Sequence, residues 1–207
     1  MIKKYFAALS ATALIGVAPY ALAASSTDLT VTGVITPNAC TPTLAGGGIV
    51  DYGKRSAKDL RPDQATSLGW ETLQLTVNCD AATEFRLLPT DNKSGTSYDG
   101  SDFGLGFINV DQKLGSFIVR IQDPIADGVA VQPLVSTTNG STWFASRLVE
   151  PNLLSAFGAV GGAATPIAIK DLQTNLRVLA RIARADSLDL TNEVALDGSA
   201  TLSIVYP

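Results

Sequence analysis

Cys40 and Cys79 are the residues of this 207-residue chain whose type most readily supports chemistry. A pair of thiols can form a disulfide, supply a nucleophile or help to bind a metal ion. The sequence contains no histidine, and two thiols alone make a poor metal site. In an oxidising compartment the pair favours a disulfide. Such a bond would close a loop of about 40 residues and stabilise the fold by roughly 4 kcal/mol in the chain-entropy model.

The sequence offers little else for catalysis. Without histidine, histidine-based triads and histidine-liganded metals are excluded, and a disulfide would leave no thiol nucleophile. Aspartates are concentrated in turn-like segments, where they usually bond to the local backbone. Asp99 and Asp102 lack the ligand spacing of a calcium loop, and Gly104-x-Gly106 lacks the third glycine of a dinucleotide site. We therefore expect no enzyme, no metal and no cofactor.

Residues 1–23 have the three zones of a secretory signal peptide. Lys3 and Lys4 form a cationic start, an apolar run follows, and Ala21-Leu22-Ala23 is a pattern that signal peptidase accepts. The apolar run is shorter than the roughly 20 residues that a spanning helix needs, which favours cleavage over a membrane anchor. We expect an exported chain, cleaved after Ala23, whose mature part is not inserted in a membrane.

The charge of the expected mature chain limits its partners. Cleavage would remove Lys3 and Lys4, which leaves 13 basic and 19 acidic residues and a net charge near −6. Nucleic acids and anionic membranes both require clustered positive charge, and this sequence has no such cluster. We expect no nucleic-acid partner.

Strands are the elements that must position the two cysteines. From Glu71 to Cys79, apolar and polar residues alternate strictly, which is typical of a half-buried strand and turns Cys79 into the core. Polar turns separate similar runs, which predicts an all-β sandwich or barrel. We expect a loop or short helix over 146–157. Over 167–183 we favour a turn and a strand rather than a helix, because the arginines alternate. The further strand-like runs are 85–88 (ended by Pro89), 115–122, 176–182 and 201–206, the last preceded by a hairpin signal at Asp197-Gly198.

Both ends of the expected mature chain carry further patterns. Before Cys40, a segment over 24–36 alternates apolar residues around one glycine, which precedes Cys40 by seven residues. The last run ends with a penultimate tyrosine. The residues concerned are Leu29, Val31, Gly33 and Ile35 at the first end, and Leu202, Ile204, Tyr206 and Pro207 at the second.

In these features the sequence resembles the subunits of chaperone–usher pili, and it looks closest to a fimbrial-like secreted family whose biology is poorly characterised. The resemblance implies an immunoglobulin-like, pilin-type β-sandwich over 37–207, whose final strand is missing and is supplied in trans. It implies a structural or minor subunit that passes through the periplasm to a fimbrium at the cell surface. The implied partners are a periplasmic pilus chaperone, an outer-membrane usher and neighbouring pilus subunits.

The resemblance also implies roles for the two ends. Residues 24–36 would form a donor strand that adds to the groove of another subunit. Leu29, Val31 and Ile35 would fill its pockets, and Gly33 would lie where the groove is shallow. The chaperone would bind the C-terminal strand, through Leu202, Ile204, Tyr206 and Pro207.

One alternative function remains open from the sequence. A secreted or periplasmic carbohydrate-binding β-sandwich, or adhesin, would have a complete fold, with 29–35 as an ordinary first strand and Tyr206 as an ordinary strand-end residue. Trp143 is then the candidate glycan contact, because an aromatic ring can stack on a sugar. Core packing is the competing explanation for this tryptophan.

Overall fold

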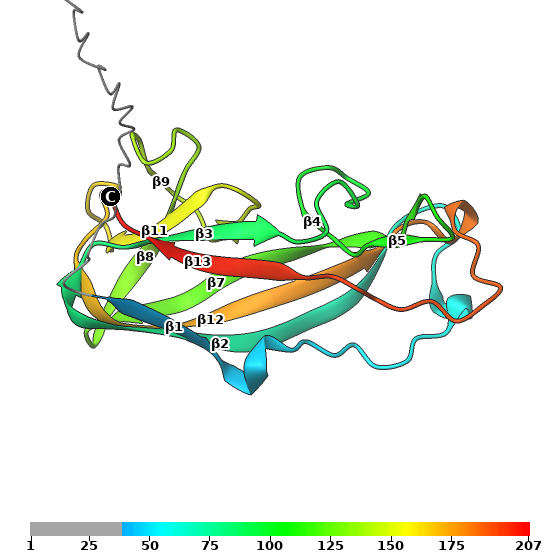
Figure 1. Ribbon diagram of the computed structural model, residues 1–207, viewed down its shortest axis with the longest axis horizontal. Coiled ribbons are helices and arrows are strands. Elements are labelled where there is room, and N and C mark those ends of the chain that lie inside the picture. The colour runs from blue at the N-terminus through cyan, green and yellow to red at the C-terminus, as the bar shows by residue number, and fades with distance from the viewer. Residues whose placement is uncertain (1–38) are drawn as a thin grey trace, which may run out of the picture. The chain divides into compact units, whose positions relative to one another are not determined.

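The computed structural model of the protein describes residues 39–207 (Figure 1). The expected signal peptide (1–23) lies outside the described residues. So does the expected donor segment (24–36), with Leu29, Val31, Gly33 and Ile35.

The described part of the chain is all-β, as the alternating pattern predicts. Residues 39–207 contain no α-helix, only short 3-10 turns, and no helix there is long and apolar enough to cross a bilayer. The strands are β1 (Cys40–Leu44), β2 (Thr66–Thr83), β3 (Arg86–Asp91), β4 (Phe103–Gly104), β5 (Phe107–Ile108), β6 (Gln112–Lys113), β7 (Gly115–Ala126), β8 (Val129–Ser136), β9 (Phe144–Ala145), β10 (Leu148–Val149), β11 (Leu154–Ala159), β12 (Ile169–Ile182) and β13 (Ala200–Val205). The 3-10 helices are η1 (Ala45–Gly48), η2 (Ala57–Asp59) and η3 (Ala185–Ser187).

The strands form a nearly closed antiparallel sheet. Its order is β1-β2-β12-β7-β8-β11-β3-β13, with β4 and β10 added beside β7 and β9 beside β8, while β5 and β6 form a separate hairpin. Figure 1 shows β3 and β13 along one side of the molecule, and β12 and β2 along the other. The two halves are joined where β7 turns into β8 at Asp127-Gly128, whose positive φ angles of 50° and 79° suit a tight hairpin turn.

The core lies between the two halves of the sheet. On β2, the predicted inward face places Leu75 and Val77 in full burial. They belong to the same cluster as Leu87 of β3 and Phe157 of β11, which come from the other half. A second cluster, which includes Leu105, Leu114 and Ile182, lies at the end where β12 pairs with the start of β7.

Two expectations about strands differ from the structure. Residues 146–157 do not form a loop or helix: they contain β10 and most of β11, whose Leu154–Phe157 are buried between β8 and β3. Pro89 does not end β3, which continues to Asp91. Because β11 pairs with β3 only at Leu87, one edge of β3 has no neighbouring strand further on, where a proline without an N–H is tolerated.

Residues 167–183 follow the favoured expectation. They form β12, which is paired on both sides, with β2 and with β7. Buried Leu176, Val178 and Ala180 alternate with Arg177 and Arg181. The helical alternative is therefore wrong.

The predicted disulfide is confirmed. Cys40 and Cys79 are bonded, with an S–S distance of 2.05 Å, and they face each other in the β1–β2 register. Cys40 is the first residue of β1, so the bond holds this short edge strand to the long strand β2.

Replacing both cysteines (Cys40→Ala with Cys79→Ala) should lower the free energy of unfolding by about 4 kcal/mol, because the bond restricts a loop of about 40 residues in the unfolded chain. Urea titration of the oxidised protein and of the double variant measures this difference. A loss below about 1 kcal/mol would contradict the entropic argument.

Candidate binding groove between β1 and β13

The sheet is open between its first and last strands. Strands β1 and β13 stand at the two ends of the strand order, and each has a paired neighbour on one side only. Counting the antiparallel pairings around the sheet shows that the two strands run in opposite directions. Each therefore presents a row of backbone groups free to bond to a further strand.

An apolar groove of about 250 Å³ follows this open seam. Its floor is formed by side chains of the core, and its walls come from the chain beside β1 and beside β13. Several wall residues, such as Leu44 and Leu202, pack against the core but remain partly exposed, so the core is incompletely covered here. The main lining residues are Leu44, Val50, Tyr52 and Leu73 on the β1 side, Leu196, Gly198 and Leu202 on the β13 side, and Phe103, Phe117, Val119, Leu176 and Val178 at the floor.

The C-terminal strand residues reach the disulfide end of this groove. Leu202 and Ile204 pack against the core, and exposed Pro207 follows the strand. The Tyr206 hydroxyl accepts a hydrogen bond of 2.9 Å from the backbone N–H of Cys40. The structure thus brings the predicted chaperone-binding residues next to β1, and it closes this end of the seam by a single polar contact.

Tyr52 fixes the wall on the β1 side. Its hydroxyl donates to the Val178 carbonyl and accepts from the Ala180 N–H, both at 3.0 Å. The β2–β12 register shifts at this point, next to Gly69 with its φ of 104°, so the tyrosine bonds to β12 backbone where the ladder is irregular. Burial raises the pKa of the Tyr52 hydroxyl above its ordinary value, although the bond from Ala180 acts in the opposite direction.

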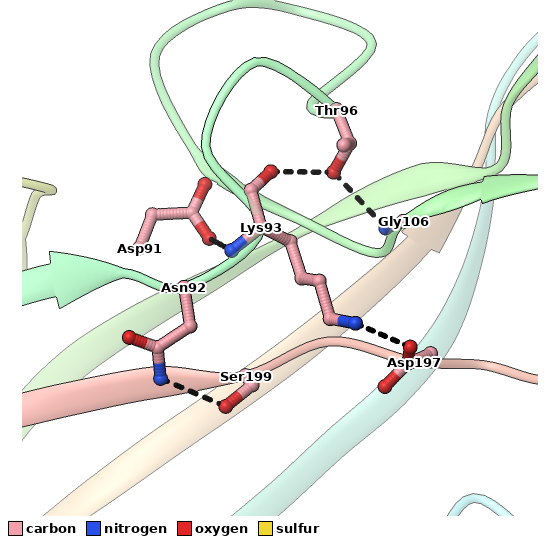
Figure 2. Close-up of polar contacts among 7 residues, drawn as sticks. All are labelled: Asp91, Asn92, Lys93, Thr96, Gly106, Asp197 and Ser199. Atoms are coloured by element: carbon pink, nitrogen blue, oxygen red, sulfur yellow. Dashed lines mark hydrogen bonds and ion pairs between the residues drawn. The ribbon is translucent and has the colours of Figure 1, made fainter. Parts of the chain in front are cut away.

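A polar network fixes the start of β13 on the opposite wall (Figure 2). The buried Asp91 carboxylate accepts hydrogen bonds from the backbone N–H groups of Lys93 at 2.8 Å and Gly104 at 3.0 Å, which shapes the loop after β3. From this loop, the Asn92 side chain donates to the Ser199 hydroxyl at 2.9 Å, and Lys93 forms an ion pair with Asp197.

Gly198 has a different role from the one predicted. Asp197-Gly198 does not form a hairpin turn, since β13 pairs with β3 and not with a strand directly before it. A Cβ at Gly198 would lie 2.8 Å from Leu105 and 2.9 Å from Phe117. The glycine therefore lets the chain pass close over the floor of the groove.

The aspartates that the sequence analysis considered serve the structure. Asp99 and Asp102 both contact the Arg181 guanidinium. Burial and the charge of Asp99 raise the pKa of Asp102; burial would also raise the pKa of Asp99, but hydrogen bonds from Ser97 and Asp102 and the Arg181 charge lower it. Within residues 39–207, no group of three or more Cys, Asp or Glu side chains is placed to hold a metal ion.

Trp143 lies apart from the groove lining, in the loop between β8 and β9. Its indole N–H donates to the Gly140 carbonyl at 3.1 Å, and the Arg86 guanidinium lies 5.6 Å from its ring centroid. The ring is partly buried, and the neighbouring Phe144 is exposed. A glycan contact at Trp143 stays a prediction.

Several residues of the groove were missed by the sequence analysis. Tyr52 and Val50 lie in an irregular segment without a period, so no local pattern reveals them. Leu196, by contrast, ends a stretch in which four of the five residues at every second position from 188 to 196 are large and apolar: Leu188, Leu190, Val194 and Leu196. That alternation could have indicated an extended segment with one apolar side.

These residues define the class of protein: it is all-β, with a disulfide on its edge strand and an apolar groove at its open seam. A family model described as "Protein of unknown function (DUF1120)" matches residues 29–123, which include residues 29–36 of the segment before Cys40 and both cysteines. Protein GltF of Escherichia coli (strain K12) is 30% identical over 99% of this chain and 98% of its own length. The uncharacterized protein YhcF of the same strain is 25% identical over 92% and 96%. The chain therefore belongs to the DUF1120 family, and GltF and YhcF are its homologues.

Tyr52→Phe should lower the free energy of unfolding by about 1–3 kcal/mol, because it leaves the Val178 carbonyl and the Ala180 N–H without a partner. Denaturant titration at neutral pH measures the loss. Tyr98→Phe is the matched control: Tyr98 is also partly buried, and no hydrogen bond contributes to the pKa of its hydroxyl. An equal loss in both variants would contradict this role of Tyr52.

The same variant has a predicted pH dependence. A raised folded-state pKa means that the neutral Tyr52 hydroxyl stabilises the fold below its unfolded pKa of about 10, and that this contribution is lost as the pH rises through the folded pKa. Between pH 9 and 11 the wild-type chain should therefore lose more stability than Tyr52→Phe. Parallel curves for the two proteins would contradict the prediction.

Proposed function

We propose that this chain is a structural or minor subunit of a surface fimbria, assembled by chaperone–usher donor-strand exchange. The observation that carries the proposal is the apolar groove between two unpaired strand edges. An unpaired edge beside exposed core side chains is a hazard for aggregation unless something covers it. A strand supplied by another molecule would pair with the edges and cover the groove at the same time.

The strand order supports a position for the proposed inserted strand. It would lie between β1 and β13 and complete an immunoglobulin-like sandwich. Run antiparallel to β13, it would be parallel to β1, since these two strands run in opposite directions. Antiparallel pairing is slightly the more stable kind, and β13 offers six residues against the five of β1, one of which is Pro42.

The donor is residues 24–36 of a neighbouring subunit in this proposal. Leu29, Val31 and Ile35 alternate and would all face the floor of the groove, while Gly33 would lie against its shallowest part. The groove is lined mainly by apolar side chains, which suits aliphatic side chains of an inserted strand. Head-to-tail insertion does not close on itself, so it gives a fibre.

Before assembly, a periplasmic chaperone would lend its own strand to the groove and bind the C-terminal strand through Leu202, Ile204, Tyr206 and Pro207. The outer-membrane usher would then exchange this strand for the donor of the next subunit. Export through the signal peptide (1–23) would place the chain where the bond between Cys40 and Cys79 can form.

The decisive test compares residues 37–207 with the same chain carrying residues 25–36 at its C-terminus through a short flexible turn. The C-terminus lies at the disulfide end of the groove, so an appended strand can turn back and run antiparallel to β13. We expect the appended strand to raise the free energy of unfolding by several kcal/mol, because it buries the open seam. Equilibrium unfolding by urea measures the difference.

A control version carries the appended strand with Val31→Asp, which places a charge in the apolar groove and should remove most of the gain. If residues 37–207 alone are already stable and neither appended strand adds anything, the groove does not accept this segment. Appending the corresponding segment of another fimbrial subunit then tests whether the donor is a different protein.

Chaperone capture provides a separate prediction. Tyr206→Ala removes a large side chain from the C-terminal strand, and we expect capture to weaken by about 2 kcal/mol, or roughly thirtyfold. Co-purification of the exported chain with the chaperone measures capture. Val110→Ala, on an exposed loop away from the groove, should leave it unchanged. Equal capture of Tyr206→Ala and wild type would show that the C-terminal strand is not the chaperone's binding site.

A further inference from the structure

The β5–β6 hairpin ends in an unusual residue. Val110 is 95% exposed at the tip, and its φ of 83° lies in the left-handed region. A β-branched side chain is strained there, and on a free surface it gains nothing from its apolar character. Strain of this kind concentrates at sites where a residue binds something.

The tip is held firmly in place. The Asn109 side chain donates to the Asp189 carbonyl at 2.7 Å and to the Gln112 side chain at 3.1 Å. Gln112 in turn accepts a bond of 2.9 Å from the Asp189 backbone. The hairpin is thus tied to the segment after η3, and it presents Val110 and the neighbouring Asp111 from a fixed base.

A cleft of about 610 Å³ lies beside the β7–β8 turn. Its lining is mainly apolar, and Ile125 and Val160 are 45% and 64% exposed. Arg147 also lines it and has no carboxylate within ion-pair distance in residues 39–207. The remaining lining residues are Pro124, Ala130, Val131, Pro133 and Ala145, which are apolar, and Asp123, Gln132 and Ser146, which are polar.

The hairpin and the cleft lie at opposite ends of one strand. Strand β7 begins two residues after β6 and ends at Ala126, beside the cleft, so the two features are separated by about 35 Å at 3.3 Å per residue. A molecule cannot place its hairpin in its own cleft. In Figure 1 the hairpin, labelled β5, and the C-terminus mark these two ends.

We propose that the β5–β6 hairpin of one copy of this chain enters the cleft of a second copy. Val110 packs against Ile125 and Val160, and Asp111 faces the otherwise unpaired Arg147. Apolar Val110 suits the mainly apolar lining of the cleft, and Asp111 is opposite in charge to Arg147. Because the surfaces differ and lie at opposite ends, the contact is heterologous and repeats along a chain of subunits.

The direction of this contact rests on the proposed donor-strand exchange. A donor running antiparallel to β13 ends near the start of β13, which is the hairpin end of the acceptor. The donor's own Cys40 follows a few residues later in the chain. Cys40 lies at the same end of the domain as the cleft, because two neighbouring residues of β12 link them: Asp171 pairs with Asn78, next to Cys79, and Leu172 pairs with Ala126. Strand exchange therefore brings the acceptor's hairpin to the donor's cleft.

Photochemical cross-linking of the full chain tests the contact. A photoreactive phenylalanine analogue replaces Val110, which has no structural partner to lose, and the same analogue at Ile49, 74% exposed and apolar, serves as the control. The proteins are exported with chaperone and usher, and cross-linked peptides of isolated fibres are identified by mass spectrometry. We expect position 110, and not position 49, to join residues 123–160 of a second copy.

Charge reversal provides an independent check. Asp111→Arg or Arg147→Asp alone should reduce the yield of this cross-link about tenfold, and the two changes combined should restore most of it. Val110→Asn, a residue that tolerates the left-handed backbone, should separately raise the melting temperature of the isolated subunit. A cross-link yield that ignores both charge reversals would overturn the proposal.

The outcomes separate this inference from the proposed function. Fibres without a cross-link from position 110, or with one to a different protein, overturn the contact between copies and leave donor-strand exchange intact. If no fibres form, the same cross-linking is done on the concentrated full chain. A product between position 110 and the cleft then supports the contact without strand exchange, and its absence overturns both.

Discussion

The structure depends on one constraint: backbone pairing runs around the sheet through eight strands, from β1 to β13, and then stops. Each interior strand of this path has a paired neighbour on both sides, whereas the first and last strands have one on a single side. Natural proteins limit such edges by keeping them short or by placing proline there, and β1 has five residues with Pro42 in its centre. What remains is a seam that resists random pairing but still exposes apolar core side chains along its length.

Two separate sets of bonds keep the seam's walls apart and in place. On the β1 side, the disulfide holds the first residue and the Tyr52 hydroxyl holds the chain further on. On the β13 side, buried Asp91 shapes the loop that carries Asn92 and Lys93 to the start of the strand. A groove fixed in advance loses little entropy when a strand enters it, so more of the burial energy remains for binding.

Sequence patterns predicted the strands whose own residues alternate between buried and exposed positions. Strict alternation over 71–79 and alternating arginines over 177–181 predicted the two longest strands, β2 and β12, and the even pair of cysteines predicted the disulfide. Strand β11 was missed, because its burial comes from β8 and β3 and its sequence has no period. Tyr52 could not be predicted at all: its partners on β12 are 126 and 128 residues away, and they are available only because β2 is irregular near Gly69.

Under the proposed donor-strand exchange, the same geometry favours a donor from another molecule over one from the same chain. Ala39 continues the line of β1, since its carbonyl accepts from the Asp80 N–H at 3.1 Å and its N–H donates to the Asp80 side chain at 3.2 Å. A strand attached to Ala39 that turned back into the groove would run antiparallel to β1 and therefore parallel to β13. Its antiparallel pairing, which is the more stable kind, would then be with β1. This strand has few free donors, because Pro42 has no N–H and the Cys40 N–H is already bonded to Tyr206. A strand from another molecule is free to run antiparallel to β13, whose six residues contain no proline. The intramolecular arrangement is thus the weaker one, and this difference favours exchange between molecules over closure within one.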